Sequence, residues 1–505
     1  MKKGQIILIL ALSWFVGTAW GQDNSPQQPT DTTPEGNPQQ PVPAFGPENP
    51  APLATDNPPI SGLDLPNLEP HAAPLSYLQA GAHLAESVDS NIANNLGGSA
   101  VHSISTALGS LELQRLWRNY DLALDYLGGV GYYNARGIGL KQIEELGVNQ
   151  KITWKRGQLG IRDAFSYQPE GTFGSAYGSV ASSGAALGGQ SVFLGGTGLG
   201  ELGQVPRIMN ISVADVVENL TPKSSITAAG AYGFIHFLGG DPVTGNSFIG
   251  SGQTSAQVGY NRILGPHDQG ALVYGYQRFH FSTGVEFDNN VVQLMWGHRI
   301  SGRMDFVVSA GPQFTQLNNV PIAVNIPTSS RCVFGGINQT GIIFECPTND
   351  FRVSAAGRFS LRYQFRRASL SLGYSHFTTS GSGFFAGAQS DIATLSVNRP
   401  LGRTWTLYSD LGYSRNRRIL GSNCSISATG TCGAGVNANT YQYGFAGAGL
   451  RKAIGRTIRV FGSYQFNDLL FDNSFCQSGT PCSRISQRHV GTIGLDWTPR
   501  PIRLD

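Results

Sequence analysis

The residues of this chain that could do chemistry together are charged side chains at even spacing in two distant segments. The candidate pore-lining residues are Asp121, Asp125, Glu145, Lys151, Arg352, Arg358 and Arg362. Side chains an even number of residues apart lie on one face of a β-strand. Acidic groups on one wall of a water-filled passage, facing guanidinium groups on the other, would create a transverse field that sorts ions by charge.

We therefore expect an eyelet in which Asp125 and Glu145 oppose Arg358 and Arg362. The alternative is that these side chains are solvated and pair locally with neighbouring strands.

The sequence contains none of the catalytic motifs expected of an enzyme. It has no His-Glu-x-x-His element and no Gly-x-Ser-x-Gly elbow, and its nine histidines are scattered. Residues 198–203 have the spacing of a dinucleotide-binding loop, but no buried parallel strand precedes them. Basic residues are not interleaved with aromatic ones, which argues against a nucleic-acid partner. We expect no enzyme activity, no cofactor and no metal. The alternative is a barrel hydrolase that collects Ser, His and Asp from different strands.

The six cysteines form three local pairs, each in a segment containing Gly, Ser, Asn or Pro between two strand-like runs. The pairs are Cys332 and Cys346, Cys424 and Cys432, and Cys476 and Cys482. An even number of cysteines in an exported chain favours disulfides. No pair has the two-residue spacing of a zinc knuckle, so a metal site is the weaker alternative. We predict three disulfides that close loops.

The elements that position the charged residues are β-strands. In residues 120–133, Tyr120, Leu122 and Tyr126 alternate with Asp121 and Asp125, and residues 351–366 and 458–466 alternate in the same way. A two-residue period indicates strands and not helices. The predicted strands are 76–86, 103–116, 120–133, 138–155, 158–167, 207–220, 224–237, 253–264, 269–281, 285–300, 304–315, 350–366, 368–377, 390–400, 403–414, 439–452, 456–466 and 486–498.

Short turns, such as 156–157 and 222–223, alternate along the chain with longer loops, which include all three cysteine pairs. This asymmetry is typical of a transmembrane β-barrel with its short turns in the periplasm. The predicted fold class is all-β, a transmembrane antiparallel β-barrel of about 18 strands over residues 76–505, with 16 as the alternative count. In an 18-strand ring the acidic strand at 120–133 lies nine strands from the arginine strand at 350–366.

Composition supports a barrel. Only 13% of residues are charged, against about 25% in soluble proteins. After the first 21 residues there is no apolar run near the roughly 20 residues that a membrane helix needs. A barrel explains both observations, because every second strand residue faces lipid. A soluble β-sandwich or propeller would need several cores and domain linkers that the sequence does not show.

The N-terminus carries two segments that precede the barrel. Residues 1–21 read as a signal peptide, with Lys2 and Lys3, an apolar run from Ile6 to Val16, and small residues at the cleavage position. Residues 22–75 contain 14 of the 27 prolines and no Lys or Arg. We predict that 22–75 is a Pro/Gln-rich disordered periplasmic leader that acts as an unpacked tether.

From about residue 76 onward the chain resembles Gram-negative outer-membrane barrels of the porin type, chiefly uncharacterised members. The features that carry the resemblance are Pro222-Lys223 leading to Tyr232, Leu401-Gly402-Arg403 leading to Tyr413, Ile454-Gly455-Arg456 leading to Tyr464, and the closing run His489 to Trp497. The closing run departs from the usual pattern because eight residues follow Trp497.

The resemblance implies an outer-membrane location in a diderm bacterium, with outer-membrane lipid and the barrel-assembly machinery as partners and a homotrimer as a further expectation. It also implies that the third external loop, here 168–206, folds into the lumen and narrows it. A surface loop is the alternative.

The function we expect is a channel for passive diffusion of small hydrophilic solutes. A polysaccharide-exporting barrel and a filled structural or adhesive surface barrel remain alternatives. A TonB-dependent transporter would need a larger barrel and a folded plug, for which residues 22–75 are too rich in proline.

Overall fold

The computed structural model describes residues 58–63, 76–92, 100–135, 139–169, 206–238, 248–324, 333–338, 341–381, 383–419, 438–476 and 483–504. The predicted signal peptide, residues 22–57 and 64–75 of the leader, and nearly all of loop 168–206 lie outside this part of the chain. No helix in the described part is long and apolar enough to cross a membrane.

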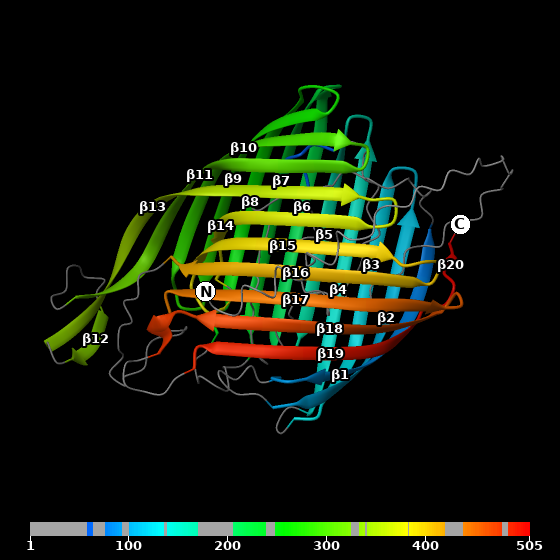
Figure 1. Ribbon diagram of the computed structural model, residues 1–505. Helices are drawn as coiled ribbons and strands as arrows, with labels where there is room; N and C mark the ends of the chain where they lie inside the picture. The colour runs from blue at the N-terminus through cyan, green and yellow to red at the C-terminus, as the bar shows by residue number, and fades with distance from the viewer. Residues whose placement is uncertain are drawn as a thin grey trace, which may run out of the picture. The chain divides into compact units, whose positions relative to one another are not determined.

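The described residues form one antiparallel sheet that curls into a barrel (Figure 1). Its strands are β1 Tyr77–Asp89, β2 His102–Leu116, β3 Tyr120–Tyr133, β4 Gly139–Trp154, β5 Gly157–Gln168, β6 Arg207–Thr221, β7 Ser224–Phe237, β8 Ser251–Ile263, β9 Asp268–Phe281, β10 Glu286–Ser301, β11 Met304–Val324, β12 Val333–Asn338, β13 Gly341–Gln364, β14 Ser369–Thr379, β15 Ala388–Pro400, β16 Trp405–Arg418, β17 Thr440–Ile454, β18 Ile458–Phe471, β19 Ile485–Trp497 and β20 Ile502–Arg503. One 3-10 turn, η2 Asn473–Phe475, follows β18.

The ring closes because the first long strand pairs with the last. β1 and β19 run antiparallel, in register from Ala82 opposite Trp497 to Asp89 opposite Val490. Of the 20 strands, β12 pairs only with β13 and β20 adds two residues beside β1, so 20 − 2 = 18 strands make the barrel. The predicted count of 18 is confirmed, and 16 is excluded.

Most predicted strands match within a few residues, and β3 and β7 match at both ends. The largest differences are β11 and β13, which were expected to be 304–315 and 350–366. They pair as far as Val324 opposite Phe344, with an irregularity after Leu317. Pro321 and Pro347 lie opposite each other in this hairpin extension. Figure 1 shows this hairpin, with β12, reaching beyond the other strands.

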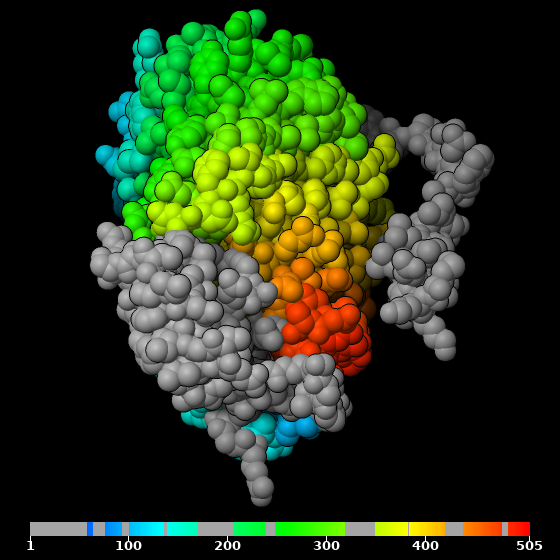
Figure 2. Space-filling model, turned by 90° about the vertical axis from the view of Figure 1, so that its left-hand side faces the viewer, coloured from blue at the N-terminus to red at the C-terminus, as the bar shows by residue number. Residues whose placement is uncertain are grey.

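The two faces of the wall differ in chemistry. On β8 the side chains of Ser255, Gln257 and Asn261 are buried, whereas Val258 and Tyr260 between them are exposed on the outside. The space-filling view shows the continuous outer wall formed by the green to orange strands (Figure 2). A closed antiparallel barrel with an even strand count and an apolar outer face is the architecture that spans the outer membrane of Gram-negative bacteria. The described part of the chain therefore has the architecture of an outer-membrane β-barrel.

The short turns gather at the end that holds both ends of the barrel. Tyr77 at the start of β1 pairs with Arg503 of β20. The turn between β17 and β18 is closed by Gly455 at φ 73°, a left-handed conformation that favours glycine. Short turns face the periplasm in such barrels, so this short-turn end is the periplasmic end.

Candidate functional site

The inner wall of β7–β11 combines uncharged hydrogen-bonding groups with apolar side chains such as Val273, Phe279 and Phe287. The buried amide and hydroxyl residues on this arc are Ser225, Thr227, Ser255, Gln257, Asn261, Gln269, Gln277, Asn289, Gln293, Ser309, Gln313 and Thr315. Cross-strand bonds fix part of this surface, since Asn289 donates to Gln277 at 2.9 Å and Thr315 donates to Asn289 at 3.2 Å. Amides and hydroxyls both donate and accept, so this wall is suited to hydroxyl-rich solutes.

The predicted acidic residues face inward on β3 and β4, where they find local neighbours. Asp121 lies opposite Lys151 in the register of β3 and β4. Asp125 lies opposite Glu112 of β2, whose carboxylate accepts a hydrogen bond from Tyr77.

Glu145 belongs to a polar chain that crosses three strands. Gln168 of β5 donates to Glu145 at 2.7 Å, and Arg207 of β6 donates to Gln168 at 3.1 Å. All three side chains are buried. The amide of Gln168 therefore links the carboxylate to the guanidinium.

The three predicted arginines lie on β13 and differ in their partners. Arg352 pairs with Asp350 at 2.9 Å and also donates to the carbonyl of Ile419. Arg362 pairs with Asp305 of β11. Among the interactions of the described residues, Arg358 has no hydrogen bond and no ion pair. Of the three arginines, Arg358 is thus the one whose charge no described carboxylate neutralises.

The ring order places the two predicted walls on opposite sides. β3 is third and β13, because β12 lies outside the ring, is twelfth, so 12 − 3 = 9 strands separate them in a ring of 18. Asp125 lies five residues after Tyr120, the first residue of β3, and Arg358 lies six residues before Gln364, the last of β13. The eyelet itself stays a prediction, whereas local pairing is observed for Glu145 and Arg362.

The loop between β14 and β15 folds into the barrel, a feature that no pattern in the sequence predicted. This aromatic loop comprises residues 380–387, of which Ser382 is outside the described residues. Phe384 and Phe385 are 5% and 0% exposed. Gly381, Gly383 and Gly387 have φ of 81°, 82° and 90°, so the loop depends on glycine for its path. The signal in the sequence was a Phe-Phe pair flanked by glycines between two strands.

The aromatic loop bridges opposite sides of the long-loop end. The ring of Phe384 lies 5.5 Å from Phe248, before β8, and 5.4 Å from Phe471 at the end of β18. The Ile249 N–H donates to the carbonyl of Gly383 at 2.9 Å. β8 and β18 are eighth and seventeenth in the ring, and therefore diametrically opposed. These contacts narrow the external mouth of the lumen.

At the other end, part of the predicted leader lies inside the barrel. We call residues 58–63 the leader turn, because the Gly62 N–H donates to the carbonyl of Pro59 at 2.9 Å. Ile60, Ser61 and Leu63 are 5%, 2% and 2% exposed. For these six residues the expected unpacked tether is wrong, because two apolar side chains flank a Ser-Gly turn and pack against the inner wall.

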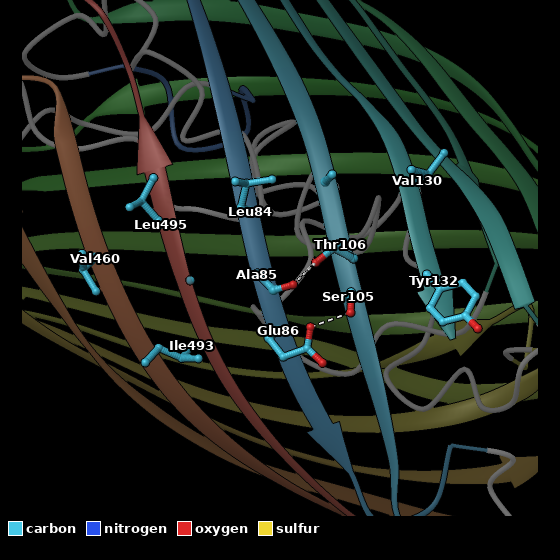
Figure 3. Close-up of a pocket in the computed structure, with 12 residues that line it drawn as sticks. Leu84, Ala85, Glu86, Ser105, Thr106, Val130, Tyr132, Val460, Ile493 and Leu495 are labelled. Atoms are coloured by element: carbon cyan, nitrogen blue, oxygen red, sulfur yellow. Dashed lines mark hydrogen bonds between the residues drawn. The ribbon is translucent and has the colours of Figure 1, made fainter. Parts of the chain in front are cut away.

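The outer face of the closing seam has an apolar groove of about 660 Å³ (Figure 3). Its lining includes Leu84 of β1, Val460 of β18, and Ile493 and Leu495 of β19. Glu86 lies at one end and accepts a hydrogen bond from Ser105. The groove opens away from the lumen, so it belongs to the lipid-facing surface.

Among the described residues, the structure gives the bonding state of one cysteine. Cys476, after η2, is disulfide-bonded. Cys332, Cys424, Cys432 and Cys482 lie outside the described residues. Val333, next to Cys332, lies opposite Glu345, next to Cys346. The three loop-closing pairs stay a prediction.

Comparison with known proteins gives likeness in structure alone. No family model matches the chain, and no curated protein matches its sequence. Among solved structures it is similar to Pseudomonas aeruginosa OccK2 (OpdF) in complex with glucuronate, at 9% identity and a TM-score of 0.37, covering 85% of this chain and 98% of that one. Acinetobacter baumannii OccAB2 gives 10% identity and a TM-score of 0.39, covering 85% and 98%. The ferric-catecholate import receptor Fiu of E. coli K12 gives 7% identity and a TM-score of 0.40, covering 83% and 81%.

Proposed function

We propose that this outer-membrane barrel is a channel through which small hydrophilic, predominantly uncharged solutes diffuse without a catalytic step. The observation that carries the proposal is the set of buried amides and hydroxyls on the inner wall of β7–β11, which lie beside apolar clusters on β9 and β10. A filled barrel needs no row of hydrogen-bonding groups on its inside, because apolar side chains pack as well.

The aromatic loop supplies the external constriction in this proposal. Loop 168–206, with its many small residues, is proposed to narrow the lumen further. Arg358 adds one unpaired positive charge to the passage, which gives a mild preference for anions over cations.

A filled structural barrel is the second candidate, and burial of the inward side chains favours it. Gln313, Asn289 and Phe287 are 0%, 1% and 0% exposed. Such packing also fits a channel that is closed in this conformation.

Planar-bilayer recording of the refolded protein tests the proposal. We expect discrete conductance steps, and liposomes that contain the protein should swell faster in neutral sugars than in sugar acids of equal size. A barrel that is folded by circular dichroism but gives no steps and no swelling would establish the filled structural barrel instead.

A further inference from the structure

The leader turn sits in a socket on the inner wall that satisfies every polar atom of Ser61. Its N–H donates to Asn261 Oδ1 at 3.0 Å, and its carbonyl accepts from Gln257 Nε2 at 2.7 Å. Its hydroxyl accepts from Asn261 Nδ2 at 2.6 Å and also bonds to the hydroxyl of Thr227. The three wall residues are themselves buried. The turn is thus held as a bound ligand would be.

Two glycines of the wall leave room for the turn. A Cβ at Gly259 would lie 2.4 Å from Ser61 Oγ, and a Cβ at Gly297 would lie 2.9 Å from Ile60 Cγ2. Neither glycine has a positive φ, so the backbone does not demand glycine at these positions. The space that the turn occupies accounts for both.

Apolar contacts extend the socket on both sides of Ser61. Ile60 belongs to a cluster with Val273 of β9 and Met295 of β10. Leu63 belongs to a cluster with Met209 and Val213 of β6. The turn therefore spans the inner wall from β6 to β10.

The socket lies close to the periplasmic end. Thr227 is three residues after Ser224, the first residue of β7, and Asn261 is two residues before Ile263, the last of β8. Only 13 residues, 64–76, join Leu63 to Tyr77 of β1. So short a connection gives the turn a high effective concentration at the socket, even if its own affinity is low.

We propose that the inner wall of β6–β10 is a binding site for the chain's own leader turn, and that the bound turn is a detachable stopper at the periplasmic end of the channel. The stopper role rests on the proposed channel function, whereas the binding site does not.

Binding is tested on a barrel in which residues 58–63 are replaced by Gly-Ser repeats. A fluorescent peptide of residues 55–66 should bind this barrel in detergent micelles saturably. The peptide carrying S61A should bind about tenfold more weakly, because it loses two hydroxyl contacts with buried partners. Gly259→Val in the barrel should abolish binding by filling the socket. Gly147→Ala should leave it unchanged, since Gly147 lies on β4, outside the β6–β10 socket, and its Cβ would be 3.8 Å from Asp125 Cβ.

The stopper role is tested by conductance of the same proteins. The turn-replaced barrel should conduct more than the native protein, and the peptide should reduce its current from the periplasmic side only.

Absence of saturable binding, or equal binding by the Gly259→Val barrel, would overturn the proposed binding site. Binding without any effect on a measurable current would overturn the stopper. Binding to barrels that never conduct would refute the channel, and the stopper with it, while the site would stand.

Discussion

At the residue scale, an inward charged side chain can act on ions in the lumen only where no ion-pair partner neutralises its charge. Arg362 is neutralised by Asp305, and Arg352 is paired at the long-loop end. Arg358 has neither kind of partner among the described interactions. Of the three predicted arginines, Arg358 is therefore the one that can contribute an unneutralised charge.

We predict that Arg358→Gln lowers the anion-to-cation permeability ratio by about twofold, because an unpaired lumen charge sets ion preference. Reversal potentials in a salt gradient measure this ratio. Arg352→Gln is the control and should change it little. Equal ratios for the native protein and Arg358→Gln would exclude this residue from selection and remove the remaining support for an eyelet.

A second residue-scale prediction concerns Asp472, which lies beyond the end of β18. Burial of its carboxylate raises the pKa, but hydrogen bonds from Ser474 and Thr440 outweigh this and hold the pKa below its ordinary value. The carboxylate accepts from the N–H groups of Thr440 at 2.7 Å and Asn439 at 3.0 Å. Because its pKa is lowered in the folded state, the ionised carboxylate stabilises the folded connection at pH values above its ordinary pKa. This stabilisation is lost as the pH falls through the folded pKa.

We therefore expect the Thr440 amide to exchange hydrogen more slowly in the native protein than in Asp472→Asn near pH 6. The difference should shrink below about pH 4, where the carboxylate becomes protonated. Mass-spectrometric exchange at each pH measures it. A difference that does not depend on pH would show that the carboxylate charge is irrelevant there.

At the element scale, the strands were predictable and the segments inside the barrel were not. Alternation along β3 and β7 determines both faces, because a one-residue slip would turn every apolar side chain inward. The aromatic loop and the leader turn lack such periodicity. Their burial follows from tertiary contacts with Phe248, Phe471 and Asn261, which are distant in sequence. Composition therefore predicted an unpacked tether for the leader, and no pattern predicted that the aromatic loop would fold inward.

The aromatic loop carries the element-scale prediction. Phe384→Ala should raise single-channel conductance by about twofold, since it opens the external constriction. It should also destabilise the fold by about 3 kcal/mol through the cavity it leaves. Phe351→Ala is the control, because that ring is 62% exposed on the outer face. Unchanged conductance with a reduced unfolding temperature would make the loop structural and not a constriction.

At the scale of the whole molecule, closure depends on the seam between β1 and β19. Eight register pairs join these strands, against thirteen between β1 and β2. On the inner face, polar contacts between β1 and β19 cross the seam. They include His83 to Asp496 at 3.0 Å, Ser87 to Thr492 at 2.9 Å, and Arg488 to Asp89 at 2.7 Å. Together they form a polar clasp behind the outer groove of Figure 3.

We predict that Arg488→Met costs about 3–5 kcal/mol, because it leaves the carboxylate of Asp89 buried without its partner. The folded band on an unheated detergent gel should then be lost at a lower temperature. Arg278→Gln breaks an exposed pair with Glu286 and should change stability by less than about 1 kcal/mol. Equal melting of the two variants would mean that the clasp does not hold the seam.

The seam also has a consequence for how the protein reaches its native state. Neighbouring strands elsewhere in the ring follow one another in the chain, with only β12 interposed between β11 and β13, whereas His83 and Asp496 are 413 residues apart. Sheet growth can proceed hairpin by hairpin at small entropic cost, but the final pairing must close the longest loop in the molecule. Until that step, the intermediate is an open sheet with two unpaired edges, each a template for pairing with another chain. A nascent chain that lacks the thirteen residues of β19 would stay trapped there, so this barrel needs β19 before a closed lumen exists.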